Sequence, residues 1–248
     1  LLQCLFFEDK NTLFYDQVNK MLKKGDNNAV IGSYISRSNI KFGHNKLNPF
    51  CYYPLKYVLK RNLILEYDFN NIFIKPSLKI LDDDKVKAKH QYLLTNGIQT
   101  AGNIFSQGGE LTDSIKAILK LEVEKYRLHF KFSNEGIIKN WPNNYDISGW
   151  LVKMKSGGKL APHIHEEGWI SGSIYINVPP KKNIDSGNFV VCINDKEKNK
   201  IQNDARESID VVTGSMCLFP SSLFHYTIPF EGEEDRIVLA FDVNPTTI

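Results

Sequence analysis

Long apolar runs and a strong charge of either sign are both missing from this sequence. No stretch of about 18 consecutive apolar residues occurs, and the mean hydropathy is −0.30, so a membrane-spanning helix is excluded. The net charge is only +3, without the basic stripe that nucleic-acid binding requires. The composition therefore predicts a globular chain that binds neither a membrane nor nucleic acid.

Cysteine and arginine are scarce as well. The 4 cysteines show no CxxC spacing, which argues against a disulfide framework and favours a reducing, cytoplasmic location. Lysine supplies 26 of the 31 basic residues and arginine only 5, so each arginine is a rare choice. The chain has no initiator Met and starts inside the apolar run LLQCLFF. Without a basic region or a cleavage site, we interpret this start as a trimmed chain and not as a signal peptide.

The N-terminal segment has the apolar spacing of helices. The spacing holds from Leu1 to Lys24 and from Asn28 to Phe42, with a Gly-Asp turn between the two segments. We predict a helical hairpin over residues 1–45, which is similar to the last unit of a tetratricopeptide-like array. A plain helical cap on the following domain is the alternative.

Residues 46–248 are expected to form a second domain. A short strand-like run covers Asn71–Ile74, and Leu111–Phe132 has the period of an amphipathic helix that packs along the outside of a sheet. From about residue 145 to 245 the pattern changes to short strands separated by glycine turns, which is typical of a jelly roll or sandwich. The strands are expected near Gly149–Lys155, Trp169–Val178, Asn188–Ile193, Ser208–Val212, Ser215–Phe219, Leu223–Ile228 and Arg236–Val243.

Three of the 6 histidines lie within or beside these strands. His163 and His165 are one residue apart, and on a strand such side chains point to the same face. His225 lies 60 positions beyond His165 in a second strand-like run. Two ligands on one strand and a third far along the chain is how a β-barrel builds a site for one metal ion. A single strand histidine is more often an ordinary core residue, so the prediction depends on the three together.

Several separated blocks carry a resemblance to a known family. The blocks HIH, SGSIYINVP, GSMCLFPSSLFH, PFEG and RIVLAFDV occur in this order between Tyr145 and Pro245. They resemble the 2-oxoglutarate/Fe(II) oxygenase family, a branch of the double-stranded β-helix dioxygenases. The resemblance implies an α+β fold, in which a double-stranded β-helix (jelly roll) follows the helical extension and residues 46–248 form the oxygenase domain.

The resemblance also implies the ligands and the reaction. The usual superfamily ligand set is His-x-Asp/Glu…His, and in this sequence His165 stands where the carboxylate would be, as is usual in this branch. The segment HIHEE can also be read as His-x-Glu, which would make Glu167 the ligand. The expected cofactors are Fe(II) and the cosubstrate 2-oxoglutarate. The expected reaction is hydroxylation of a small molecule or peptide, with release of succinate and CO2.

An arginine or lysine about ten residues after the last histidine anchors 2-oxoglutarate in this superfamily, and Arg236 follows His225 by 11 residues. Its planar fork can pair bidentately with a carboxylate. This role requires that His225 pairs with Ala240 and Pro229 with Arg236 in one hairpin. The alternative is a strand-edge arginine in a salt bridge with Glu233 or Glu234.

Other side chains are weaker candidates. Ser171, Ser173 and Tyr175 alternate on one face of a strand, where they either bond the cosubstrate or simply pack. Trp150 and Trp169 either line a substrate pocket or fill the β core. Two other classes of protein stay open: a cupin-like metalloprotein that does not use 2-oxoglutarate, and a non-catalytic binding module.

Overall fold

The computed structural model describes residues 1–106, 108–194 and 205–246. Its helices are α1 (Leu2–Phe7), α2 (Asn11–Lys23), α3 (Ala29–Phe42), α4 (Lys75–Leu81), α5 (Glu110–His129) and α6 (Gly136–Lys139). Its strands are β1 (Leu59–Asn62), β2 (Ala88–Lys89), β3 (Leu94–Thr100), β4 (Tyr145–Leu160), β5 (Ile170–Asn177), β6 (Phe189–Cys192), β7 (Arg206–Ile209), β8 (Ser215–Pro220), β9 (Phe224–Thr227) and β10 (Arg236–Pro245). No helix among these residues combines the length and the apolar character that crossing a membrane would require.

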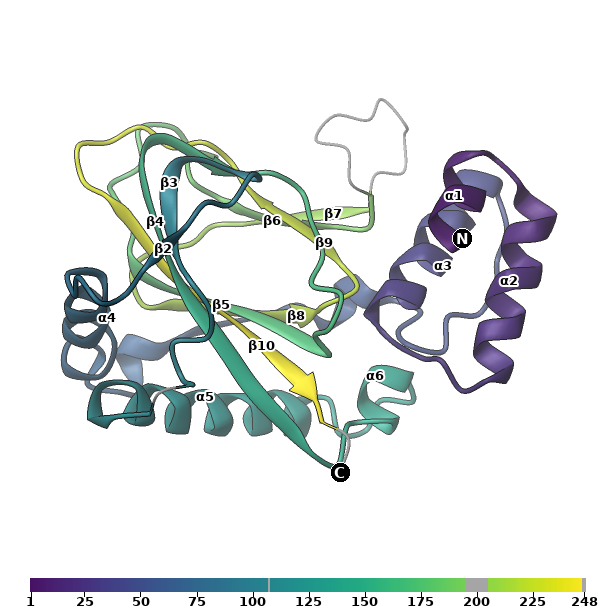
Figure 1. The fold of residues 1–248 in the computed structure, drawn as a ribbon, viewed down its shortest axis with the longest axis horizontal. Helices are drawn as coiled ribbons and strands as arrows, with labels where there is room; N and C mark the ends of the chain where they lie inside the picture. The colour runs from purple at the N-terminus through teal and green to yellow at the C-terminus, as the bar shows by residue number, and fades with distance from the viewer. Residues whose placement is uncertain (107, 195–204, 247–248) are drawn as a thin grey trace.

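Two antiparallel sheets face each other (Figure 1). The larger sheet has the order β1-β8-β5-β10-β4-β3-β2, and the smaller has the order β7-β6-β9. Along the chain the strands change sheet repeatedly, since β5, β8 and β10 belong to the larger sheet and β6, β7 and β9 to the smaller one. This alternation is the topology of a double-stranded β-helix, which confirms the predicted fold class.

The two faces of the larger sheet bury different chemistry. On β10, Ile237, Leu239 and Phe241 point into the main apolar core, whereas Arg236 and Asp242 are in phase on the other face. Strand β5 behaves in the same way. Its Gly172 lies directly under the Phe241 ring, so that any Cβ there would collide with the ring. The larger sheet therefore packs its apolar face against the main core and presents polar side chains of β10 and β5 to the space between the two sheets.

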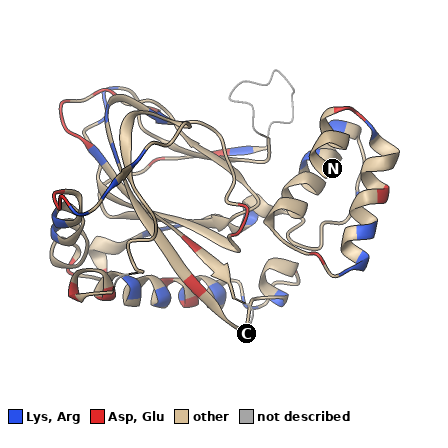
Figure 2. Ribbon diagram, viewed as in Figure 1, with Lys and Arg blue, Asp and Glu red and all other residues tan. Residues whose placement is uncertain are grey.

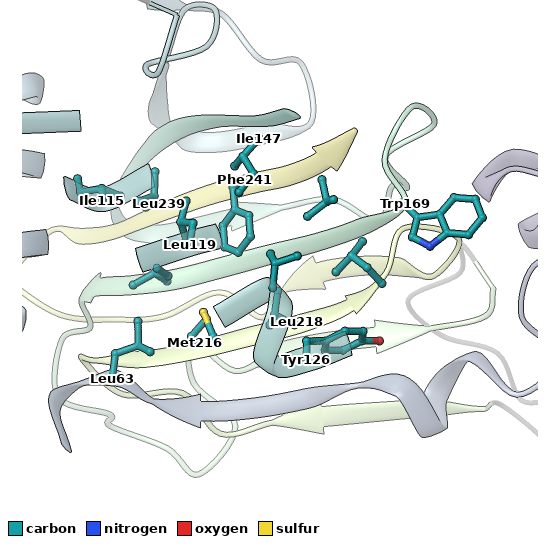
Figure 3. Close-up of a cluster of buried hydrophobic side chains, with 14 of the residues drawn as sticks. Leu63, Ile115, Leu119, Tyr126, Ile147, Trp169, Met216, Leu218, Leu239 and Phe241 are labelled. Carbon is teal, nitrogen blue, oxygen red and sulfur yellow. The ribbon is translucent and has the colours of Figure 1, made fainter. Parts of the chain in front are cut away.

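Helix α5 covers the outer face of the larger sheet, as predicted. Its buried stripe includes Ile115 and Leu119, which lie against Leu239 and Phe241 (Figure 3). Acidic and basic residues follow one another along the helix (Figure 2). One acid, Glu122, falls on the buried stripe and is only 1% exposed. Lys125 at 2.7 Å and Arg61 at 3.6 Å neutralise its carboxylate, and the Tyr67 hydroxyl donates a hydrogen bond of 2.7 Å to it.

The N-terminal helices have an apolar core of their own. The single helix predicted over Leu1–Lys24 is wrong in detail, because α1 ends at Phe7 and α2 begins at Asn11. Asp9, between them, has a φ of 55°, which a helix cannot contain. The extension thus has three helices instead of two. The residues α1 and α2 bury include Leu2, Phe6, Phe14 and Val18.

Helix α3 joins the extension to the rest of the chain. The Asn48 side-chain amide donates a hydrogen bond of 2.7 Å to the carbonyl of Gly32. The Phe50 ring sits so close that a Cβ on Gly32 would lie 2.9 Å from it. Glycine at position 32 therefore lets α3 approach the segment that leads into the barrel.

The strand expected at Asn71–Ile74 is also wrong. Residues Asn70–Ile74 form one turn of π-helix that continues into α4. Pro76 lies in the first turn of α4, directly after the π-helical turn. The proline therefore lies inside a helical segment here instead of interrupting a strand.

Candidate metal centre and its cavity

The three candidate histidines meet at one place between the two sheets. His225 lies on β9, and its backbone forms a pair of hydrogen bonds with His163, of 3.2 Å and 2.9 Å. The strand predicted to carry His163 and His165 is reduced to this isolated bridge. Because the chain stays extended there, the two side chains still point to the same side, toward His225.

The ligand atoms of the three rings are close enough for one ion. They all lie within 4.8 Å of one another. The Nε2 atoms of His163 and His165 are 3.3 Å apart, and the ring centres of His163 and His225 are 4.2 Å apart. Such a cluster matches the spacing of ligands around one metal ion.

Hydrogen bonds orient each ring with Nε2 toward the centre. Nδ1 of His163 lies 2.9 Å from the carbonyl oxygen of Ala161. Nδ1 of His165 lies 2.6 Å from Oδ1 of Asp242, and Nδ1 of His225 lies 3.5 Å from the carbonyl of Leu223. Carbonyl and carboxylate oxygens only accept, so Nδ1 carries the proton and Nε2 keeps its lone pair. Lone pairs facing each other at 3.3 Å repel unless a cation lies between them.

Burial keeps the imidazoles of His163 and His225 neutral. It lowers the pKa of His163 to about 4, with a further contribution from the charge of His165. Burial also lowers the pKa of His225 well below its usual value. A neutral imidazole is the form that binds metal, and three of them suit a transition metal such as Fe(II). The residues present therefore fit the expected ion.

Glu167, the alternative ligand, lies elsewhere. It is exposed, in the turn that follows His165, and it does not belong to the histidine cluster. Its neighbour Glu166 lines the cavity instead.

A cavity of about 560 Å³ opens onto the histidines. Its inner wall comes from both sheets, and includes Ser173 and Tyr175 of β5, Phe189 of β6, and Val238 and Ala240 of β10. Two of the three weaker β5 candidates, Ser173 and Tyr175, thus face the cavity.

Ser171 does not line the cavity. Its hydroxyl donates to Asp242 over 2.7 Å and lies 2.8 Å from the Ser221 hydroxyl, behind the ring of His165. The two tryptophans also differ. Trp150 lines the cavity, whereas the Trp169 indole N–H donates a hydrogen bond of 2.8 Å to the carbonyl of Ile137 in the main core.

The hairpin register predicted for Arg236 is wrong. β9 pairs with β6, and β10 pairs with β4 and β5, so His225 and Ala240 are on different sheets. Ala240 pairs with Trp150 and Ser173 instead. The connection between β9 and β10 crosses from one sheet to the other, which adjacent strands of one hairpin never do.

Arg236 nevertheless faces the space between the sheets. It is 1% exposed, and its Cζ lies 5.1 Å from the centre of the Tyr175 ring. Its Nη1 donates to the carbonyl of Gly187, while Nε and Nη2 are buried without a hydrogen-bond partner among the described residues. The salt bridge to Glu233 or Glu234 is not formed within the described chain. A buried guanidinium with unpaired N–H groups is costly, and an anion would offset that cost.

Asp242 was not predicted as a site residue, although it makes the shortest polar contact with the histidines, the 2.6 Å contact to His165. A signal was present, because Arg236 and Asp242 are in phase on one strand. An acid on the inward face of a buried strand requires a partner.

The helical extension forms part of the outer end of the cavity, which sequence analysis also missed. Phe7 of α1, and Val30 and Tyr34 of α3, line the cavity together with Tyr92 from the segment before β3. The extension lies beside β9 at one end of the barrel (Figure 1). The periodicity of a helix predicts which of its faces is buried, but it does not predict which other segment its remaining residues contact.

Comparison with known proteins agrees with this geometry. Residues 148–242 match a family model described as "Putative 2OG-Fe(II) oxygenase". No curated protein matches the chain.

Solved structures show the same fold at low sequence identity. A prolyl-4-hydroxylase from Pseudomonas putida is 12% identical, with a TM-score of 0.55 over 77% of this chain and 93% of that one. A prolyl hydroxylase from Trichoplax adhaerens, in complex with a hypoxia-inducible-factor peptide fragment, is 11% identical, with a TM-score of 0.51 over 86% and 90% of the two chains. The non-heme α-ketoglutarate-dependent epimerase SnoN is 8% identical, with a TM-score of 0.53 over 75% and 76%.

The match covers all three histidines, Arg236 and Asp242, and the family uses Fe(II) and 2-oxoglutarate. The barrel region of this chain, residues 148–242, therefore matches the 2OG-Fe(II) oxygenase family, a family of oxidoreductases.

Proposed function

We propose that this chain is a dioxygenase that hydroxylates its substrate while converting 2-oxoglutarate to succinate and CO2. The observation that carries the proposal is the convergence of three histidine rings in a cavity whose lining residue Tyr175 packs against a buried arginine, Arg236, that has unpaired N–H groups. When bound, the iron would activate O2 for the oxidation of a C–H bond. The chain's residues would hold the reactants in place.

His163, His165 and His225 would hold the iron. Their hydrogen bonds through Nδ1 leave Nε2 free, and burial keeps the rings of His163 and His225 unprotonated at neutral pH. No rearrangement of the rings is then needed to present three lone pairs, which lowers the cost of binding.

Arg236 would pair with the distal carboxylate of 2-oxoglutarate, and its unpaired Nε and Nη2 are the donors that such a pair uses. Burial raises the pKa of Tyr175 well above its usual value. Its hydroxyl therefore stays protonated at neutral pH and can donate to the same anion. Ser173 lines the cavity beside Tyr175 and offers a second hydroxyl.

The substrate would enter at the outer end of the cavity, between the helical extension and the segment around Tyr92. Phe7 is 53% exposed and Tyr92 is 83% exposed, although both line the cavity. Exposed aromatic rings at a cavity mouth are a common means of holding a small molecule or a peptide.

The test is an anaerobic titration of the Fe(II)-loaded protein with 2-oxoglutarate, which follows the weak visible charge-transfer band of the chelate. The expected result is a saturable band and, after O2 is admitted, one succinate formed per 2-oxoglutarate consumed. Bound iron without any such band would instead indicate a cupin-like metalloprotein that does not use 2-oxoglutarate. Failure to bind iron would indicate a non-catalytic module.

A further inference from the structure

We propose that Asp242 is a positioning residue for His165 and supplies the negative charge that the three-histidine ligand set lacks. The inference deepens the proposed function, because it concerns the same metal site. It rests on a buried hydrogen-bond network that connects β10, β5 and the segment after β8.

The network is short and closed. Oδ1 of Asp242 lies 2.6 Å from Nδ1 of His165. The Ser171 hydroxyl donates to the same oxygen over 2.7 Å, and Ser171 and Ser221 are 2.8 Å apart. Asp242 is 8% exposed, and both serines are fully buried. Water therefore has little access to the carboxylate, and its interaction with His165 is only weakly screened.

The backbone holds the carboxylate in place. Asp242 pairs with Ser171 in the β10–β5 register, so their side chains share a face. The backbone of Gly168 also lies close to the carboxylate, since a Cβ on Gly168 would be 3.3 Å from Oδ1 of Asp242. The carboxylate therefore has little room to turn away from His165.

Asp242 cannot itself be the third metal ligand in this arrangement. It contacts Nδ1, and the Nε2 atom that faces the other histidines is on the opposite side of the same ring. A carboxylate in this position accepts the Nδ1 proton and makes Nε2 a stronger donor to a metal.

His165 differs from the other two histidines in this respect. Backbone carbonyls of Ala161 and Leu223 accept from His163 and His225, so among the described residues no carboxylate accepts a hydrogen bond from these two rings. His165 occupies the position where the superfamily resemblance places a ligand carboxylate. In this chain the carboxylate of Asp242 instead contacts Nδ1 of His165, on the side of the imidazole away from Nε2, the atom that would bind the metal.

The experiment compares Co(II) binding to the wild-type protein and to Asp242→Asn, monitored by visible absorbance. Asparagine keeps the shape and an acceptor oxygen but removes the charge. We expect Co(II) affinity to fall by about 10- to 100-fold, as is typical for partners behind a metal ligand. Ser171→Ala leaves the Asp242–His165 contact in place and should weaken binding by only a few-fold.

The matched control is Asp235→Asn. Asp235 precedes the same strand and pairs with Lys153 at 3.1 Å, away from the histidines, so its removal changes the net charge equally and should leave Co(II) affinity within about twofold of wild type. Thermal unfolding of each metal-free variant establishes that it is folded. Wild-type affinity in a folded Asp242→Asn protein would overturn the proposal.

A second measurement needs no metal. In metal-free protein at about pH 8, well above the usual pKa of histidine, the ¹⁵N shifts of His165 should report a proton on Nδ1, and Asp242→Asn should mix the two tautomers. A proton on Nε2 in the wild-type protein would overturn the role of Asp242. If wild-type protein binds no Co(II) but shows the expected tautomer, the proposed metal function fails while the positioning contact stands.

Discussion

The inner and outer ends of the cavity are built in different ways. At the inner end, strands of both sheets hold His225, which lines the cavity, and Arg236 and Asp242, which lie behind the lining residues Tyr175 and His165. Each of the three is less than 10% exposed and forms hydrogen bonds. At the outer end, Phe7 and Tyr92 come from a short helix and a connecting segment and are more than half exposed. The inner end is suited to holding small charged reactants in one geometry. The outer end is suited to adapting to a substrate.

The largest effect is expected from removing a histidine at the inner end. His163→Ala and His225→Ala should each abolish stoichiometric Fe(II) binding and turnover, because two imidazoles leave the site without its third donor. His165→Ala should do the same, while Glu167→Gln should keep the metal. Iron content after anaerobic reconstitution is the measurement.

The control for this series is His129→Ala, which removes a histidine from α5, outside the cavity. Unchanged iron content in His163→Ala or His225→Ala would rule out the proposed three-histidine metal site. Loss of iron in Glu167→Gln with retention in His165→Ala would show that the carboxylate completes it.

A smaller effect is expected at Arg236. Removing a bidentate, buried charge pair costs about 2–5 kcal/mol, which corresponds to 2-oxoglutarate affinity weaker by roughly 30-fold or more. Arg236→Ala should therefore keep Fe(II) but require more 2-oxoglutarate. Arg236→Lys should be intermediate, because an ammonium keeps the charge and loses the fork. Calorimetric titration of the iron-loaded protein measures both.

The surface arginine Arg127, paired with Glu124 on α5, provides the control: Arg127→Ala should bind 2-oxoglutarate normally. Normal 2-oxoglutarate affinity in a folded Arg236→Ala protein would show that Arg236 has only a structural role. The inner end of the cavity would then not bind the 2-oxoglutarate carboxylate through this residue.

At the outer end we expect the opposite pattern. Phe7→Ala and Tyr92→Ala should leave the affinities for Fe(II) and 2-oxoglutarate within about twofold of wild type. The KM of any substrate that stimulates succinate formation should rise by about tenfold, equivalent to the loss of about 1.4 kcal/mol of aromatic contact. Leu13→Ala, at a residue on α2 that is 57% exposed and outside the cavity, is the matched control. A loss of 2-oxoglutarate affinity in Phe7→Ala would remove the distinction between the two ends.

The last prediction concerns pH and the metal-free protein. The pKa of His163 is about 4 when folded and about 6.5 when unfolded. Below about 6.5 the unfolded chain therefore takes up a proton that the folded chain does not, and stability falls by at most about 1.4 kcal/mol per pH unit for this residue. The total for His163 is about 3 kcal/mol, so Tm should decline by roughly 6–12 °C as the pH falls from about 6.5 toward about 4.

Above about pH 6.5, His163 is unprotonated in both the folded and the unfolded chain, so its titration has no effect on Tm. His163→Gln should flatten the decline, whereas Phe7→Ala should follow the wild-type curve. A Tm of the wild-type protein that rises with acidification would contradict the assignment of neutral, buried histidines.

Local pattern was sufficient for most elements. All seven strands expected after residue 145 occur, and the long helix occurs as α5. The bounds differ most at β4, which begins at Tyr145 and ends at Leu160, and at β7, which shares only Ser208 and Ile209 with the expected strand. The strands β1, β2 and β3 were not expected. β2 has only two residues, and β3 contains Asn96 and Gly97, which are poor strand formers. Pairing with longer strands of the sheet stabilises these strands, although their own sequences do not favour strand structure.

The spacing His163-x-His165 and the position of His225 were enough to predict which side chains meet, because an extended chain puts residues i and i+2 on one side. The sequence alone also determined the inward face of β10, on which Arg236 and Asp242 alternate with apolar residues. Only the tertiary structure decided that β9 and β10 belong to different sheets, that Asp242 stands behind His165, and that the helices reach the cavity. These are contacts between segments far apart in the chain, and the free energy that selects them comes from packing two sheets and a helical unit together, which no local pattern records.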